Sequence, residues 1–228
     1  MRIAILTFDG FNEIDSFVAS YMINRVDRPG WKAEITSPTP EVESGRGVRV
    51  RAQQPLEFAN EADAVLVGSG LLTRRLAVDP SVLSRLSLDP RRQLVGSQCS
   101  GALILAKLGI LGSMPACTDH GTRPLVEAAG IHVLNQPFFA RGNVATAGGC
   151  LSSHYLATWV IWQLAGPAAA EEALSWVVPV GQESDWTSRA MRVVGEFIGE
   201  AATHESAIAE RVRQEGSSPA LSALPESS

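Results

Sequence analysis

Residues 93–108 read QLVGSQCSGALILAKL. The first six are uncharged and include Leu94, Val95 and Gly96, which predicts a buried strand. Residues 101–108 are densely apolar, which predicts a buried helix. Cys99 lies between the two, with the small residue Ser97 two positions before it and Gly101 two positions after it. A tight strand-to-helix turn needs small neighbours on both sides, so this spacing predicts a nucleophile elbow that carries sulfur in place of oxygen.

The position of Cys99 also bears on its reactivity. A helix that begins directly after it would aim backbone N–H groups at the sulfur and favour the thiolate. We therefore expect iodoacetamide at mildly acidic pH to label Cys99 before the other two cysteines, Cys117 and Cys150. The alternative is a buried structural cysteine, which is the commonest fate of a free cysteine.

Strand and helix signals alternate along the chain. Compact apolar runs predict strands at residues 2–8, 31–36, 47–51, 62–67, 93–98, 131–134 and 143–147. Apolar residues at helical spacing predict helices that include residues 14–22, 101–108, 122–129, 151–164 and 190–198, and Asp79-Pro80 opens another. Buried strands that alternate with helices predict an α/β fold with a mostly parallel sheet covered on both faces.

Length and composition indicate how many domains the chain forms and which kinds of partner it can bind. The chain has 228 residues, of which 45% are hydrophobic and 19% charged, with a net charge of −5. We expect a single domain over residues 1–200 and a C-terminal extension over residues 201–228, partly helical and then a polar tail. Basic residues form no block larger than an arginine pair, which argues against a nucleic-acid partner.

Neither a membrane nor an oxidising compartment is expected. The densest apolar run, residues 155–165, is too short to span a bilayer and fits a buried helix. The three cysteines are an odd number, and together with the lack of a signal peptide this predicts reduced thiols and a cytoplasmic location. Their spacing is not that of metal ligands, so neither a metal nor another cofactor is expected.

Loops after other strands supply candidate partners for Cys99. The carboxyl ends of parallel strands share one edge of a sheet, so residues that follow different strands lie together there. Asp15 follows the first predicted strand at a helix start, where an acid serves either as a partner of the thiol or as a helix cap. Ser69 and Gly70 follow another strand, and backbone N–H groups in that loop would bind an anionic intermediate.

A fourth loop and a histidine leave further candidates open. Gly149 ends a late strand at the same edge and is a candidate for substrate binding. Cys150 follows it and precedes a helix, so it is a rival thiol, although its strand lacks the elbow spacing. His120 lies on a loop, where it is either an ordinary polar residue or an acid–base partner of Cys99.

Three segments resemble the ThiJ/PfpI superfamily, which has a class I glutamine amidotransferase-like fold. They are residues 3–15 (IAILTFDGFNEID), residues 98–111 (QCSGALILAKLGIL) and residues 142–149 (GNVATAGG). The segments follow the order of that superfamily, and the likeness extends to about residue 180. The resemblance implies a flavodoxin-like three-layer α/β sandwich, often a homodimer, with a reactive cysteine on the elbow that is hydrogen-bonded to an acid after the first strand.

Within that superfamily the motifs are most similar to the isocyanide hydratase branch. That branch has an aspartate after the first strand, as at Asp15, and a hydroxyl residue after the cysteine, as at Ser100. The similarity implies a cofactor-free lyase that hydrates an isocyanide to an N-substituted formamide. Two features depart from the branch: residues 68–70 are Gly-Ser-Gly instead of Pro-Gly-Gly, and Asp119 occupies the place of a histidine.

Two other functions remain open. A low-pKa cysteine oxidises readily, so the chain would also suit a non-catalytic redox or ligand-sensing protein. A cysteine amidase or protease would need His120 beside Cys99. The expected partners are a small-molecule substrate and a second copy of the chain, since closed two-fold dimers are the commonest assemblies.

Overall fold

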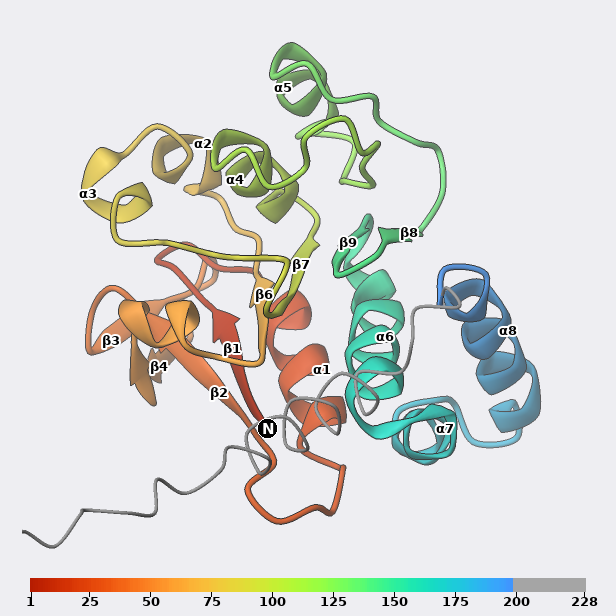
Figure 1. Ribbon diagram of the computed structural model, residues 1–228. Coiled ribbons are helices and arrows are strands. Elements are labelled where there is room, and N and C mark those ends of the chain that lie inside the picture. Colours follow the sequence, from red (N-terminus) through yellow and green to blue (C-terminus); the bar gives the residue numbers. More distant parts are fainter. Residues whose placement is uncertain (199–228) are drawn as a thin grey trace, which may run out of the picture.

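The computed structural model describes residues 1–198 and has a seven-stranded sheet at its centre (Figure 1). The strand order is β5-β2-β1-β6-β7-β9-β8, and every neighbouring pair is parallel except β8 with β9. The strands are β1 (Arg2–Leu6), β2 (Lys32–Ser37), β5 (Gln54–Pro55), β6 (Ala64–Val67), β7 (Leu94–Gln98), β8 (Phe138–Arg141) and β9 (Val144–Ala147). The predicted α/β fold is confirmed, while the extension expected at residues 201–228 lies outside the described residues.

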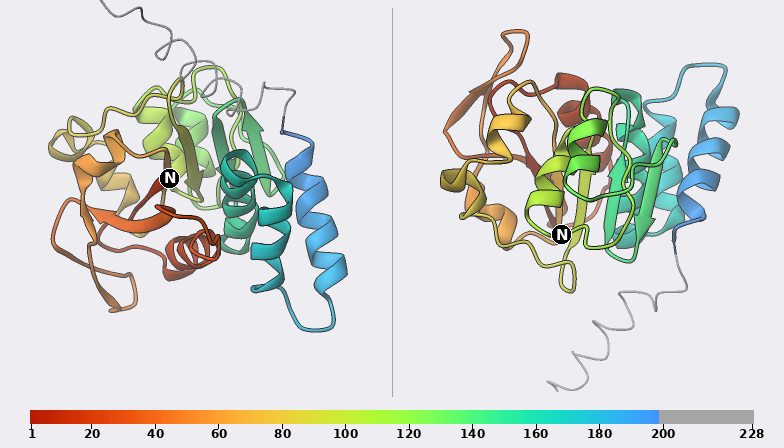
Figure 2. Two further views of the ribbon diagram at one scale, coloured as in Figure 1. Left: turned by 60° about the horizontal axis from the view of Figure 1, so that its bottom comes forward. Right: turned by 90° about the horizontal axis from the view of Figure 1, so that it is seen from above.

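Alternate residues of the central strands enter two different hydrophobic cores. In β1, Ile3 and Ile5 belong to one core and Ala4 and Leu6 to the other. Four helices close the first core: α1 (Glu13–Ile23), α6 (Ser153–Ala165), α7 (Pro167–Ser175) and α8 (Glu183–Gly195). Shorter helices close the second core on the opposite face of the sheet (Figure 2): η1 (Leu56–Asn60), α2 (Thr73–Leu76), α3 (Pro80–Leu83), α4 (Gly101–Lys107) and α5 (Arg123–Ala128). Because helices cover both faces, the central strands are buried and mostly apolar, although β7 also buries Ser97 and Gln98.

Several short elements differ from the sequence-based expectations. Residues 131–134, predicted as a strand, make only an isolated bridge between Val133 and Ala116. The strand predicted at residues 47–51 is β4 (Arg49–Arg51), which pairs with β3 (Glu41–Glu43) in a separate antiparallel sheet. No strand is predicted where β8 lies, yet it pairs with β9 through a turn at Gly142, whose φ is 55°. The partner of a short strand is chosen by tertiary packing, which a local apolar pattern does not reveal.

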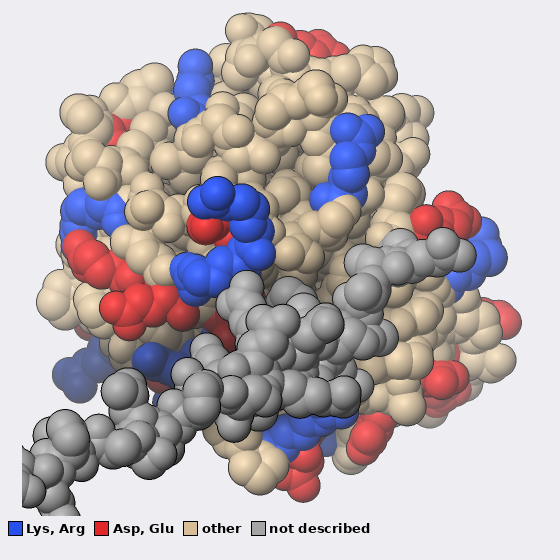
Figure 3. Space-filling view, viewed as in Figure 1, with Lys and Arg blue, Asp and Glu red and all other residues tan. Residues whose placement is uncertain are grey.

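The apolar run at residues 155–165 lies in α6, inside the fold, where Trp159 is fully buried. Within residues 1–198, no helix combines the length and the apolar character needed to cross a membrane. On the face shown in Figure 3, basic and acidic side chains of the described residues are interspersed.

Candidate active site

The turn after β7 has the strained backbone of an elbow. Cys99 has a φ of 46° and is the one non-glycine residue with a positive φ among residues 1–198. Its N–H donates to the carbonyl of Ala147 at 2.8 Å, and its own carbonyl accepts from the Thr118 hydroxyl at 2.8 Å. Residues other than glycine rarely adopt this backbone conformation unless their surroundings impose it. Such strain is typical of functional sites.

Gly101 allows this turn to approach the neighbouring strand. A Cβ atom at Gly101 would lie 2.4 Å from the carbonyl oxygen of Val67 and 2.8 Å from that of Gly68. Both are backbone atoms, which cannot swing aside as a flexible side chain would. The small residue two positions after Cys99 is therefore required by contact with β6.

We expect Gly101→Ala to destabilise the fold by about 1–3 kcal/mol, because the added methyl group overpacks against backbone. The free energy of unfolding, measured by urea denaturation, tests this. The matched control is Gly195→Ala in α8, whose Cβ would meet only the Trp162 side chain, at 3.2 Å. The control should stay within about 1 kcal/mol of the wild type. Equal stability of wild type and Gly101→Ala would contradict the steric requirement.

Asp15 is buried at the start of α1 and does not cap that helix. The cap is Asn12, whose side-chain oxygen accepts the N–H of Ile14 at 3.1 Å. Asp15 is 2% exposed, and its Oδ2 accepts a short hydrogen bond from the Ser69 hydroxyl. Its Oδ1 has no hydrogen-bond partner within the described part of the chain. The alternative interpretation of Asp15 as a capping acid is therefore wrong. Asn12, a strong cap residue after the first strand, is the signal that would have shown this.

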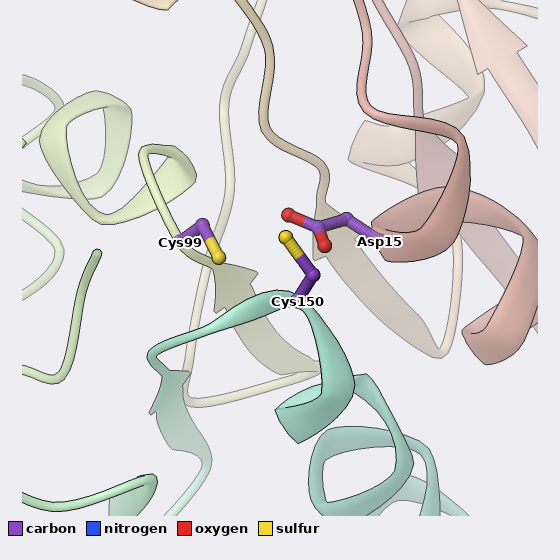
Figure 4. Close-up of side chains that lie close together, drawn as sticks. All are labelled: Asp15, Cys99 and Cys150. Atoms are coloured by element: carbon purple, nitrogen blue, oxygen red, sulfur yellow. The ribbon is translucent and has the colours of Figure 1, made fainter. Parts of the chain in front are cut away.

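The side chains of Asp15, Cys99 and Cys150 converge from the first turn of α1, the turn after β7 and the short helix η2 (Figure 4). A carboxylate oxygen and the two sulfurs lie within 4.8 Å of one another. Cys150 begins η2 (Cys150–Ser152), and its sulfur accepts a hydrogen bond from the side-chain amide of Asn12 at 3.1 Å. Three such atoms at this spacing could ligate a metal ion, and the expectation of no metal stays a prediction.

Burial makes a second negative charge in this cluster costly. It raises the pKa of the Cys99 thiol, and an ionised Asp15 raises it further, in the direction opposite to the thiolate-favouring effect expected from the following helix. Burial also raises the pKa of Asp15, against the opposing effect of the Ser69 hydrogen bond. The pKa of Cys150 is raised by the same two causes as that of Cys99. Carboxyl and thiols therefore titrate as a coupled group, in which one site can hold a charge when its neighbours keep their protons.

We expect Asp15→Asn to shift the onset of Cys99 alkylation to lower pH than in the wild type, because the amide cannot oppose the thiolate as a carboxylate does. Iodoacetamide labelling followed over pH by mass spectrometry measures this. Cys117 is the internal control: it is fully buried, burial raises its pKa to about 12, and its labelling should be slow in both proteins. The wild-type protein also tests the predicted order of labelling, in which Cys99 reacts before Cys150. If Cys150 is labelled first, then Cys150 and not Cys99 is the nucleophile.

A cavity of about 570 Å³ opens above the cluster. Cys99, Cys150 and Gly70 line it, while Asp15 lies beneath its wall. The N–H of Gly70, a candidate donor to an anionic intermediate, donates to the Ser100 hydroxyl at 3.2 Å, and Ser100 in turn donates to Thr73 at 2.9 Å. An anion at Gly70 would have to displace Ser100.

The sequence did not point to the cationic side chains of this cavity. Arg46 and Arg74 both line it, and the acidic residues Glu13 and Asp119 line it as well. The Arg74 guanidinium donates to the carbonyl of Gly121 at 3.0 Å and so links α2 to the loop before α5. Neither arginine belongs to a recognisable motif, and only the tertiary structure brings them to the site.

The remaining predicted site residues lie elsewhere. His120 is exposed and lines a second cavity of about 360 Å³, which contains neither Cys99 nor Asp15 in its wall. Gly149 lines that second cavity too, and its carbonyl accepts from the Gln98 side chain at 2.9 Å. The structure thus brings Asp15, Ser69 and Gly70 to the cavity that Cys99 lines, and places His120 at the second cavity.

Fold and elbow together define an α/β protein with a cysteine at the carboxyl edge of a mostly parallel sheet. The sequence profile of the DJ-1/PfpI family matches residues 1–162. The chain therefore belongs to the DJ-1/PfpI family, which confirms the resemblance found in the sequence.

Solved structures show the same fold. Schizosaccharomyces pombe DJ-1 is 17% identical, with a TM-score of 0.67 over 78% of this chain and 100% of that one. A ThiJ/PfpI family protein from Pseudomonas syringae is 20% identical, with a TM-score of 0.70 over 86% of both chains. A ThiJ/PfpI domain protein from Brachyspira murdochii is 20% identical, with a TM-score of 0.62 over 70% of this chain and 94% of that one. No curated protein matches the sequence significantly.

Proposed function

We propose that this protein is a cofactor-free, cysteine-dependent hydratase or hydrolase of a small electrophilic substrate. The observation that carries the proposal is the buried carboxyl of Asp15, with a raised pKa, held by Ser69 within 4.8 Å of the elbow thiol of Cys99. A carboxyl whose pKa lies close to working pH can donate a proton and later remove one. Isocyanide hydration to an N-substituted formamide is a reaction that uses both abilities.

The proposed reaction passes through a covalent intermediate. The Cys99 sulfur attacks the isocyanide carbon, and protonated Asp15 delivers its proton to that carbon, which leaves a thioimidate on Cys99. Asp15, now a carboxylate, takes a proton from water while the water oxygen attacks the same carbon. The carbon–sulfur bond then breaks, the thiolate is released, and the product tautomerises to the formamide. Ser69 and Ser100 hold Asp15 and the Gly70 loop in place.

Screening isocyanides, glyoxals and amides against the wild type and Cys99→Ser tests the proposal. Turnover of one class by the wild type alone would support it and identify the substrate. Turnover that survives in Cys99→Ser would refute a role for the elbow thiol. The separation of His120 from the Cys99 cavity disfavours the amidase or protease alternative, so amides serve mainly as a comparison.

The second candidate is a non-catalytic redox sensor, which the presence of a second thiol beside Cys99 favours. A sensor would take up oxidant stoichiometrically at Cys99 and would turn over none of the substrates in the panel. Peroxide titration with mass spectrometry, run alongside the screen, separates these two functions.

We further propose that the chain forms a two-fold homodimer through the outer face of α1. Ile14, Phe17 and Tyr21 lie there at helical spacing and are 44%, 37% and 49% exposed, although their periodicity alone predicts a buried face. Trp176, 58% exposed, lies beside them and stacks under Arg25. Apolar side chains gathered in this way are typical of an interface.

We expect light scattering at micromolar protein to give the mass of two chains, and Tyr21→Glu to give that of one, because a buried charge at the interface is costly. The matched control is Val180→Glu, at a residue 95% exposed in the turn before α8, which should remain a dimer. A wild type that stays monomeric at every concentration tested would contradict the proposal.

A further inference from the structure

Cys150 is a second thiol within the site, and the proposed reaction does not use it. Its sulfur lies within 4.8 Å of the Cys99 sulfur, and both residues line the same cavity. Cys150 is partly exposed, so an oxidant that reaches Cys99 through the cavity also passes Cys150. The third cysteine, Cys117, is fully buried and belongs to neither the cluster nor the lining of that cavity.

We propose that Cys150 is the resolving thiol of Cys99: it converts an oxidised Cys99 into a reversible intramolecular disulfide. The oxidant is a hydroperoxide. The Cys99 sulfur attacks the peroxide oxygen, the O–O bond breaks, and an alcohol or water leaves, so Cys99 becomes a sulfenic acid. The Cys150 sulfur then attacks the Cys99 sulfur, the S–O bond breaks and the S–S bond forms. The Cys150 proton and the departing hydroxyl leave as water.

The geometry supports the second step. A disulfide has an S–S distance of about 2.05 Å, so the sulfurs need to approach by at most about 2.8 Å. Cys150 begins a short 3-10 turn directly after Gly149, which has a φ of 86°, and glycine has access to more backbone conformations than any other residue. A change of the Cys150 rotamer, with adjustment at Gly149, can supply this movement.

Side chains around the pair serve both steps. Asn12 donates to the Cys150 sulfur at 3.1 Å and orients it. The Gln98 side-chain amide donates to the Cys99 sulfur at 3.4 Å, which stabilises negative charge on that atom. The Asp15 carboxylate lies within 4.8 Å of both sulfurs, where it can accept the Cys150 proton and pass it to the leaving hydroxyl.

The disulfide would switch the site off and protect it. It occupies the Cys99 sulfur, so no substrate can be attacked, and it prevents further oxidation to the irreversible sulfinic acid. The inference rests on Cys99 being the reactive thiol of the proposed function, but not on any particular substrate. A test by mass spectrometry therefore does not depend on finding an activity.

The three cysteines fall in different tryptic peptides: residues 93–107, 108–141 and 142–189. The full-length protein is treated with excess hydrogen peroxide, more than the two equivalents that a sulfinic acid requires, its free thiols are blocked with iodoacetamide, and the monomer band of a non-reducing gel is digested. We expect a linked pair of peptides 93–107 and 142–189, lost on treatment with dithiothreitol. Peptide 108–141 should be fully alkylated throughout.

Two variants sharpen the result. In Cys150→Ser we expect Cys99 to gain two oxygen atoms under the same peroxide dose, and dithiothreitol should no longer recover the thiol. Cys117→Ser should still give the linked pair. Wild-type Cys99 oxidised to sulfinic acid beside a fully alkylated Cys150 would overturn the inference alone. Linkage found only in a dimer band would also overturn it. Unmodified Cys99 would overturn both this inference and the reactive thiol, whereas linkage without turnover in the substrate screen would refute only the proposed enzyme.

Discussion

Cys99→Ser is expected to lower turnover by a factor on the order of 10³ or more, on whichever substrate class the screen identifies. The serine hydroxyl fits the same turn but is a far weaker nucleophile than a thiolate. The strained φ of Cys99 is provided by the Ala147 and Thr118 hydrogen bonds, which the variant keeps. The loss should therefore appear in kcat with little change in folding.

Circular dichroism and thermal unfolding of Cys99→Ser check that the fold is intact. Cys117→Ser is the matched control, since Cys117 is buried away from the cavity and should leave turnover close to that of the wild type. A Cys99→Ser protein with wild-type kcat would exclude the elbow thiol as the nucleophile.

Asp15→Asn is expected to lose turnover and gain stability. The amide still accepts from Ser69 and can donate toward a sulfur, but it cannot transfer a proton, so kcat should fall by about 10²–10⁴-fold. Asp15→Ala should lose these polar contacts as well. Full activity of Asp15→Asn would refute the acid–base role even if Cys99 is confirmed.

The gain in stability of Asp15→Asn depends on pH in a defined direction. Burial raises the pKa of Asp15 in the folded protein above its ordinary value of 3.8. Below that value the carboxyl is protonated in both folded and unfolded chains and costs nothing. As pH rises through the folded pKa, the unfolded chain ionises more easily, and the wild type loses stability. We expect the unfolding temperature of Asp15→Asn to exceed that of the wild type at neutral pH, with a gap that closes in acid. A gap that is constant with pH would contradict a raised pKa.

Local patterns were enough to predict the central part of the fold. Strands buried on both faces are mostly apolar, so β1 and β6 are visible as short apolar runs, and the start of β7 as Leu94 and Val95, although β7 also buries Ser97 and Gln98. Short strands outside the parallel part of the sheet were harder to predict from the sequence. β8 and the β3–β4 pair depend on which neighbour each segment meets, and residues 131–134 have the apolar pattern of a strand but make a single bridge.

The candidate site was predicted in part, for the same reason. Parallel strands end at a common edge, so the order of strands and loops places Asp15, Ser69 and Gly70 toward Cys99. The order of strands and loops did not predict the role of each side chain at that edge. Ser69, expected to contact an anion, holds Asp15, and the Gly70 N–H is occupied by Ser100.

The sequence by itself determined the position of the elbow, because a strand, a cysteine with small neighbours and an apolar helix follow one another directly in the chain, whereas the contact that requires glycine at position 101 is made with β6. Tertiary structure alone decided which groups surround the sulfur. The contacts of α1 with α6 and η2 bring Asp15 and Cys150 together, whereas the loop after α4 turns His120 toward a different cavity. Side-chain direction and burial arise from packing between distant segments, and burial is what raises the pKa values on which the chemistry of this cluster depends.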